Sequence, residues 1–90
     1  MKIHVDIANG YKQTHIKQLM LDNPAFTDLD ATTRFIDSKY SAWIKRKLGN
    51  DFTIFDITED TFRIDFTYED DANAFVKQVG GRVIEEADGA

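Results

Sequence analysis

The segment at residues 52–57 carries large apolar side chains on both of its faces. In an extended strand Phe52 and Ile54 would face one side, whereas Phe55 and Ile57 would face the other. The segment also lacks the proline, lysine or bulge signals that protect an edge strand from pairing. Two explanations follow: the long helical part of the chain folds over the open face or edge, or a second chain pairs or stacks with the strand.

The chain is long enough for one core and too short for two. Its 90 residues predict a single domain over residues 1–90, with an ordered core at about 1–85 and a frayed tail at 86–90. The absence of cysteine excludes disulfides, thiolate metal ligands and thiol nucleophiles. Because the sequence shows no export signal and no membrane-length apolar run, we expect a cytoplasmic protein without a membrane partner.

Charge divides the chain into two unlike halves. Residues 1–50 contain eight Lys and Arg against five Asp and Glu, a net +3, whereas residues 51–90 contain three against eleven, a net −8. The overall acidity makes nucleic acid an unlikely partner and favours a basic one, including a protein that itself binds nucleic acid. Ordinary solvated surface charge and mimicry of nucleic acid both remain open as readings of the acidic half.

The first half of the chain predicts one strand and two helices. Residues 2–8 alternate, with Ile3 and Val5 on the apolar face. Thr14 is a plausible N-cap for a short helix that Pro24 ends. Apolar residues at three- and four-residue spacing predict a longer helix at about residues 29–48.

The second half predicts a hairpin, a helix and a last strand. Strands at 52–57 and 62–68 flank the turn at 58–61. Thr67 and Asp70 resemble a capping box for a helix that ends at Gly80-Gly81, with Val79 facing inward, and residues 82–85 form the last strand.

This order of elements is typical of an α+β fold, the split βαβ (ferredoxin-like) sandwich. We expect a four-stranded antiparallel sheet with helices on one face and an extended first helical segment.

The open face of such a sheet offers little chemistry. It would place Lys2, His4 and Asp6 beside Arg63 and Asp65, without the aromatic side chains on which bases stack. The sequence contains no glycine-rich phosphate loop and no nucleophile elbow. We therefore assign no catalytic, cofactor-binding or metal-binding residue and expect no cofactor. The basic residues near the end of the long helix are explained by the helix dipole without a ligand.

Two short segments resemble known proteins. Val5-Asp6-Ile7, an aspartate closing the first strand, resembles the CRISPR-associated integration subunit related to endoribonucleases, which would make Asp6 a residue of a metal-dependent nuclease. Residues 66–81 resemble a segment of small accessory proteins of tailed bacteriophages, in which an aromatic strand end leads to acidic residues, alanine, phenylalanine, lysine and glycine. That resemblance implies a phage protein acting in the host cytoplasm.

The leading prediction is a non-enzymatic protein-binding module, plausibly a phage-encoded modulator or inhibitor of a host protein. One alternative is a small structural protein that forms a homodimer through the second strand, and another is the Asp6 nuclease. The partner-binding residues that we predict lie on the second strand, the hairpin turn and the start of the last helix: Phe55, Ile57, Glu59, Asp60, Glu69, Asp70 and Asp71.

Overall fold

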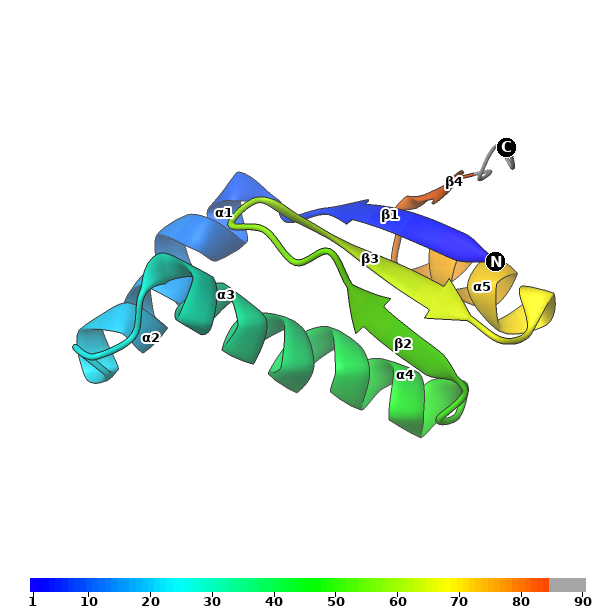
Figure 1. Cartoon of the computed structure of the whole chain (residues 1–90), viewed down its shortest axis with the longest axis horizontal. Coiled ribbons are helices and arrows are strands. Elements are labelled where there is room, and N and C mark those ends of the chain that lie inside the picture. Colours follow the sequence, from blue (N-terminus) through cyan, green and yellow to red (C-terminus); the bar gives the residue numbers. More distant parts are fainter. Residues whose placement is uncertain (85–90) are drawn as a thin grey trace.

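The computed structural model describes residues 1–84, which form an antiparallel sheet with helices packed on one face (Figure 1). The strands are β1 (Lys2–Asp6), β2 (Phe52–Phe55), β3 (Thr61–Phe66) and β4 (Arg82–Ile84). The helical elements are α1 (Asn9–Tyr11), η1 (Lys12–Ile16), α2 (Lys17–Asp22), α3 (Asp28–Ile36), η2 (Asp37–Ser41), α4 (Ala42–Lys47) and α5 (Glu69–Gln78). The expectations for Glu85 and for the tail at 86–90 lie outside the described residues.

The sheet has the order β2-β3-β1-β4, and all neighbouring strands are antiparallel. The prediction of a four-stranded antiparallel sheet is therefore confirmed. Ile3 of β1 pairs with Ile64 of β3, and His4 pairs with Arg63, so the apolar and charged rows of the two central strands coincide. The predicted assembly of Lys2, His4, Asp6, Arg63 and Asp65 on one face is confirmed by this register.

The first helix begins earlier than the sequence suggested. α1, η1 and α2 are continuous, and the N–H of Tyr11 already donates to the Ala8 carbonyl at 3.0 Å. Thr14 is therefore not the N-cap. It lies inside the helix, where its hydroxyl donates to the Gly10 carbonyl at 2.7 Å. The prediction was wrong because a threonine hydroxyl satisfies a carbonyl within a helix as readily as it caps one.

The long helix runs without a break through α3, η2 and α4. It begins at a capping box in which Thr27 accepts from the Asp30 N–H and the Asp30 carboxylate accepts from the Thr27 N–H, both at 3.1 Å. It ends at Gly49, whose φ of 126° lets its N–H reach the Ile44 carbonyl at 2.9 Å. Its extent agrees with the prediction of residues 29–48.

The start of α5 differs from the predicted capping box. Tyr68 is the N-cap, and no side chain forms a capping hydrogen bond there. The N–H of Thr67 instead donates to the Asp51 carbonyl at 3.0 Å, which holds Thr67 at the end of the β2–β3 pair. Val79, expected to face inward, is 38% exposed because α5 has ended before it.

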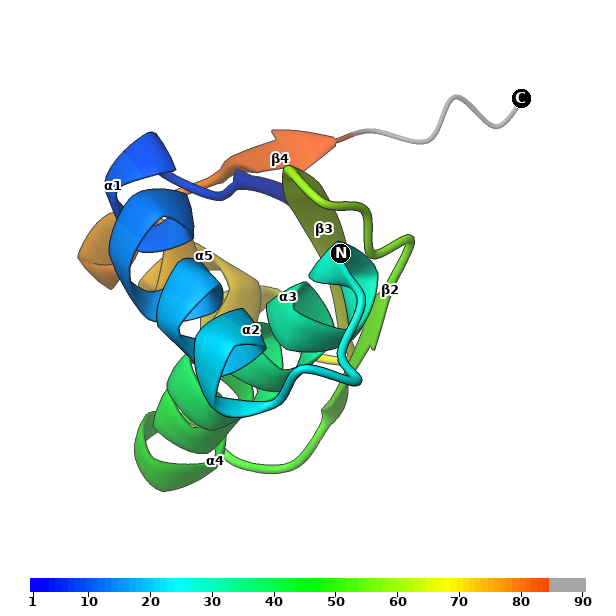
Figure 2. The ribbon, with the colours of Figure 1, turned by 90° about the vertical axis from the view of Figure 1, so that its left-hand side faces the viewer.

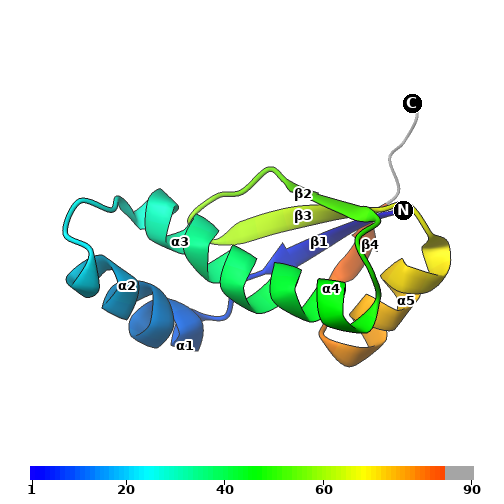
Figure 3. The same ribbon diagram turned by 90° about the horizontal axis from the view of Figure 1, so that it is seen from below.

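The core lies between the sheet and the helices. The inward rows of β1 and β3 meet an aromatic cluster in which Tyr40 lies 4.9 Å from Phe62 and Phe75 lies 5.6 Å from Phe66, between ring centroids. Figures 2 and 3 show the long helix on the same side of the sheet as α5. The long helix thus covers the inner side of β2 and leaves the open face of the sheet uncovered.

Candidate functional site

The predicted partner-binding residues fall into two separate groups. Phe55, Ile57, Glu59 and Asp60 lie at the end of β2 and in the turn before β3, whereas Glu69, Asp70 and Asp71 form the first turn of α5. β3 connects the two groups, and its six residues span roughly 17–20 Å. Figure 1 shows the two groups at opposite ends of the sheet. The structure does not bring them together into one site.

Asp60 already has partners within the chain. Its carboxylate pairs with the Lys12 ammonium group, and its carbonyl accepts from the Ile7 N–H at 2.8 Å. The hydrogen bond from Asp60 raises the pKa of Lys12. These contacts tie the hairpin turn to the first helix, so Asp60 has a structural role that the sequence did not reveal.

The acidic residues at the start of α5 are explained by the helix itself. Glu69, Asp70 and Asp71 occupy the first turn, where carboxylates offset the positive end of the helix dipole. They still give this end of the molecule a concentration of negative charge.

The open face of the sheet carries ion pairs rather than an assembled metal centre. The His4 Nε2 atom lies 3.1 Å from the Asp6 carboxylate, and Arg63 lies 3.6 Å from Asp56. Within residues 1–84, no three His, Asp or Glu side chains lie close enough together to hold a metal ion. Asp6 is thus placed beside a single histidine.

β2 has a free outer edge. The N–H of Phe66 donates to the Met1 carbonyl at 2.9 Å, so the backbone groups of Phe66 point toward β1. By the alternation of antiparallel pairs, its partner Phe52, and Ile54 two residues on, direct their backbone groups away from β3. The Phe52 N–H donates to Asn50 at 3.0 Å, whereas Ile54 presents both its N–H and its carbonyl to the outer edge.

The side chains of β2 confirm its two apolar faces. Phe52 and Ile54 are half-buried against the core, and the Phe52 and Phe66 rings lie 6.3 Å apart. Phe55 is half-buried on the open face, where the Lys2 ammonium group lies 5.8 Å from its ring centroid.

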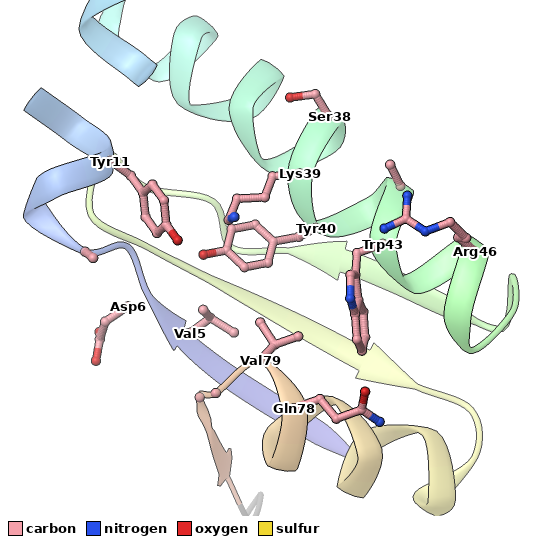
Figure 4. A pocket seen from close by; sticks show the side chains of 14 residues that line it. Val5, Asp6, Tyr11, Ser38, Lys39, Tyr40, Trp43, Arg46, Gln78 and Val79 are labelled. Carbon is pink, nitrogen blue, oxygen red and sulfur yellow. The ribbon is translucent and has the colours of Figure 1, made fainter. Parts of the chain in front are cut away.

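A pocket of about 560 Å³ lies between the long helix and the segment that leaves α5. Figure 4 shows Tyr11 reaching into it from the first helix, and Lys39, Tyr40 and Trp43 from the long helix. Gly80 and Gly81 line its opposite wall. The pocket therefore combines aromatic rings with cations and phenol groups.

Tyr40 is the most constrained side chain of the pocket. Only 6% of it is exposed, and its hydroxyl forms no hydrogen bond with the residues that the structure describes. Burial, and then the nearby Tyr11, raise the pKa of Tyr40, which keeps its hydroxyl protonated as a donor. The group is thus held ready for an acceptor.

Comparison with known proteins gives no identification: the chain matches no family model, no curated protein and no solved structure. Within the described chain, no helix combines the length and the apolarity that crossing a bilayer needs.

Sequence reasoning missed the pocket. Lys39 and Arg46 were attributed to the helix dipole, although seven residues, or two helical turns, separate them and place them toward one side. That spacing beside Tyr40 and Trp43 was the available signal. Tyr11 and the two glycines reach the pocket only through tertiary packing, which no local pattern reports.

Proposed function

We propose that the chain is a non-enzymatic protein-binding module that receives an extended, basic segment of a partner protein along the free edge of β2. The supporting observation is the outward N–H and carbonyl of Ile54 on a strand that no described residue pairs along its outer side. An added strand would satisfy both groups, and its side chains would cover Phe55.

We also propose that the fold is the split βαβ (ferredoxin-like) sandwich. The order of elements and the sheet order β2-β3-β1-β4 support this assignment, with the first helical segment enlarged to two helices. In this fold β2 is an edge strand, as the proposed binding mode requires.

Charge favours a basic partner over a second copy of the chain. Asp51 precedes β2, and Asp56 and Glu59 follow it, so carboxylates bound both ends of the free edge. Antiparallel pairing of two β2 strands would bring Asp51 of one copy toward Asp56 of the other, which costs electrostatic energy. Glu69, Asp70 and Asp71 would add long-range attraction for a basic partner.

Two further candidates carry less support. The homodimer would use the same edge and meets the repulsion just described. The nuclease would use Asp6, which lies beside His4 without a third ligand among residues 1–84. The resemblance of residues 66–81 to phage accessory proteins would place the partner in the cytoplasm of a bacterial host.

Affinity capture from bacterial lysate with two matched variants tests the proposal. Ile54→Ala removes the side chain and keeps the outward N–H, whereas Ile54→Pro removes that N–H as well, at an edge position where proline breaks no ladder bond. We expect the wild type and Ile54→Ala to retain the same basic protein and Ile54→Pro to lose it, with thermal unfolding confirming that each variant folds. Equal capture by both variants would reject strand addition at this edge.

A further inference from the structure

We infer that the pocket between the long helix and the end of α5 binds a small planar organic anion, a carboxylate or a phosphate ester. This inference goes beyond the proposed function, because the pocket is distinct from the β2 edge. Its volume of about 560 Å³ falls in the range of small-molecule sites, roughly 300–1,000 Å³.

The positive charge of the pocket is not neutralised within the chain. Neither Lys39 nor Arg46 forms an ion pair with any residue from 1 to 84. Lys39 rests instead on aromatic rings, 4.7 Å from the Tyr11 centroid and 5.9 Å from that of Tyr40. Asp6, the one carboxylate among the lining residues, is paired with His4. An anion would therefore meet two available cations.

Tyr40 supplies the donor that gives the site direction. Its side chain is more than nine-tenths buried, and its unpartnered hydroxyl points into the pocket (Figure 4). A buried donor without a partner is costly, whereas an acceptor beside it gains a hydrogen bond without competition from bulk water. The ammonium group of Lys39 next to this hydroxyl makes a negatively charged acceptor the best match.

The walls of the pocket suit a planar body attached to the anion. Tyr11 and Trp43 present aromatic surface from two different helices, and Val5 and Val79 add apolar contact (Figure 4). Trp43 is held edge-on against Phe75, 6.0 Å between centroids, so its orientation is fixed by the core. Aromatic rings at a site edged by cations favour a planar anion over a hydrated inorganic ion.

Fluorescence of Trp43, the only tryptophan in the sequence, provides the readout. The probes are adenosine 5′-monophosphate with adenosine as its neutral match, and benzoate with benzyl alcohol as its neutral match. We expect saturable binding of at least one anion, with a dissociation constant of about 1 mM or lower, and binding of its neutral match at least about tenfold weaker. The two pairs distinguish a phosphate ester from a carboxylate.

Three variants locate the binding. Lys39→Gln and Arg46→Gln should each weaken the bound anion about tenfold, and Tyr40→Phe, which removes one oxygen, about three- to tenfold. Lys45→Gln is the matched control, because Lys45 adjoins Arg46 on the same helix and does not line the pocket. It should change the affinity less than twofold, about 0.4 kcal/mol or less.

Other outcomes would overturn the inference. No saturation by either anion, neutral matches that bind as tightly as the anions, or an equal loss in Lys45→Gln and Arg46→Gln would each reject an anion site in this pocket. Tyr40→Phe keeps the ring in the core, so its result stands even where a charge variant folds poorly.

Discussion

The ammonium group of Lys39 lies 4.7 Å from the centroid of the Tyr11 ring, so a cation of the long helix rests on an aromatic side chain of the first helix. Tyr11 in turn lies 5.4 Å from Phe35, between centroids. This contact joins the two helices at the mouth of the pocket.

A double-mutant cycle measures that contact. Tyr11→Leu, Lys39→Met and the double variant should show a coupling of about 0.5–1 kcal/mol in the free energy of unfolding, the usual size of an accessible cation–π pair. Urea denaturation provides the values. Strictly additive effects would mean that the contact contributes nothing to stability.

Stability at alkaline pH should depend on Tyr40. Because its folded pKa is raised above the ordinary 10.0, the folded state holds this proton longer than the unfolded state does. Its contribution is present below pH 10 and is lost as pH rises through the folded pKa. Tyr40→Phe should therefore lose less stability than the wild type above pH 10, in thermal unfolding between about pH 9 and 11.

Gly81 should tolerate no side chain. Its φ is 92°, and a Cβ there would lie 2.9 Å from the His4 carbonyl oxygen. Gly81→Ala should lower the free energy of unfolding by about 1–3 kcal/mol. Gly10→Ala, at an open helical position, should be neutral or stabilising by up to about 1 kcal/mol. Equal effects of the two changes would contradict the close approach of residue 81 to β1.

Helix capping distinguishes two threonines. Thr27→Ala breaks the capping box of α3 and should cost about 1 kcal/mol. Thr67→Ala removes a hydroxyl that forms no cap and should cost less than about 0.5 kcal/mol. Urea denaturation of both variants provides the comparison, and a larger loss at Thr67 would restore the capping box predicted from the sequence.

The oligomeric state separates strand addition from self-pairing. Because like charges bound the β2 edge, we expect light scattering after size exclusion to give the monomer mass of 10.3 kDa across a range of protein concentration and salt. A dimer that Phe55→Lys converts into a folded monomer would favour the structural homodimer instead.

Local periodicity was enough to predict the architecture. The alternation around Ile3 and Val5 and the apolar spacing along residues 29–48 define which side of each element faces the core. Together with the hairpin, they led to the four antiparallel strands and to β2 at an edge. The boundaries were less predictable, because Thr14 and Thr67 have cap-like sequence contexts whose hydrogen bonds go elsewhere.

The candidate sites depended more on tertiary contacts. The two-faced character of β2 was visible in Phe52 and Phe55, but the pairing of Asp60 with Lys12 joins residues far apart in the sequence. The pocket likewise combines Tyr11, the long helix and the glycines after α5. No repeat or spacing within one segment encodes such a meeting.

The π-helical turns η1 and η2 give the length of the helices a consequence of its own. A π turn accommodates one residue more than an α-helical turn, and each residue rotates the following side chains by about 100°. Deleting one residue within η2 would let the helix relax to regular geometry and turn Trp43 and Arg46 away from the pocket. Gain or loss of the pocket in evolution would therefore require only a single-codon insertion or deletion, without any substitution of the residues that line it.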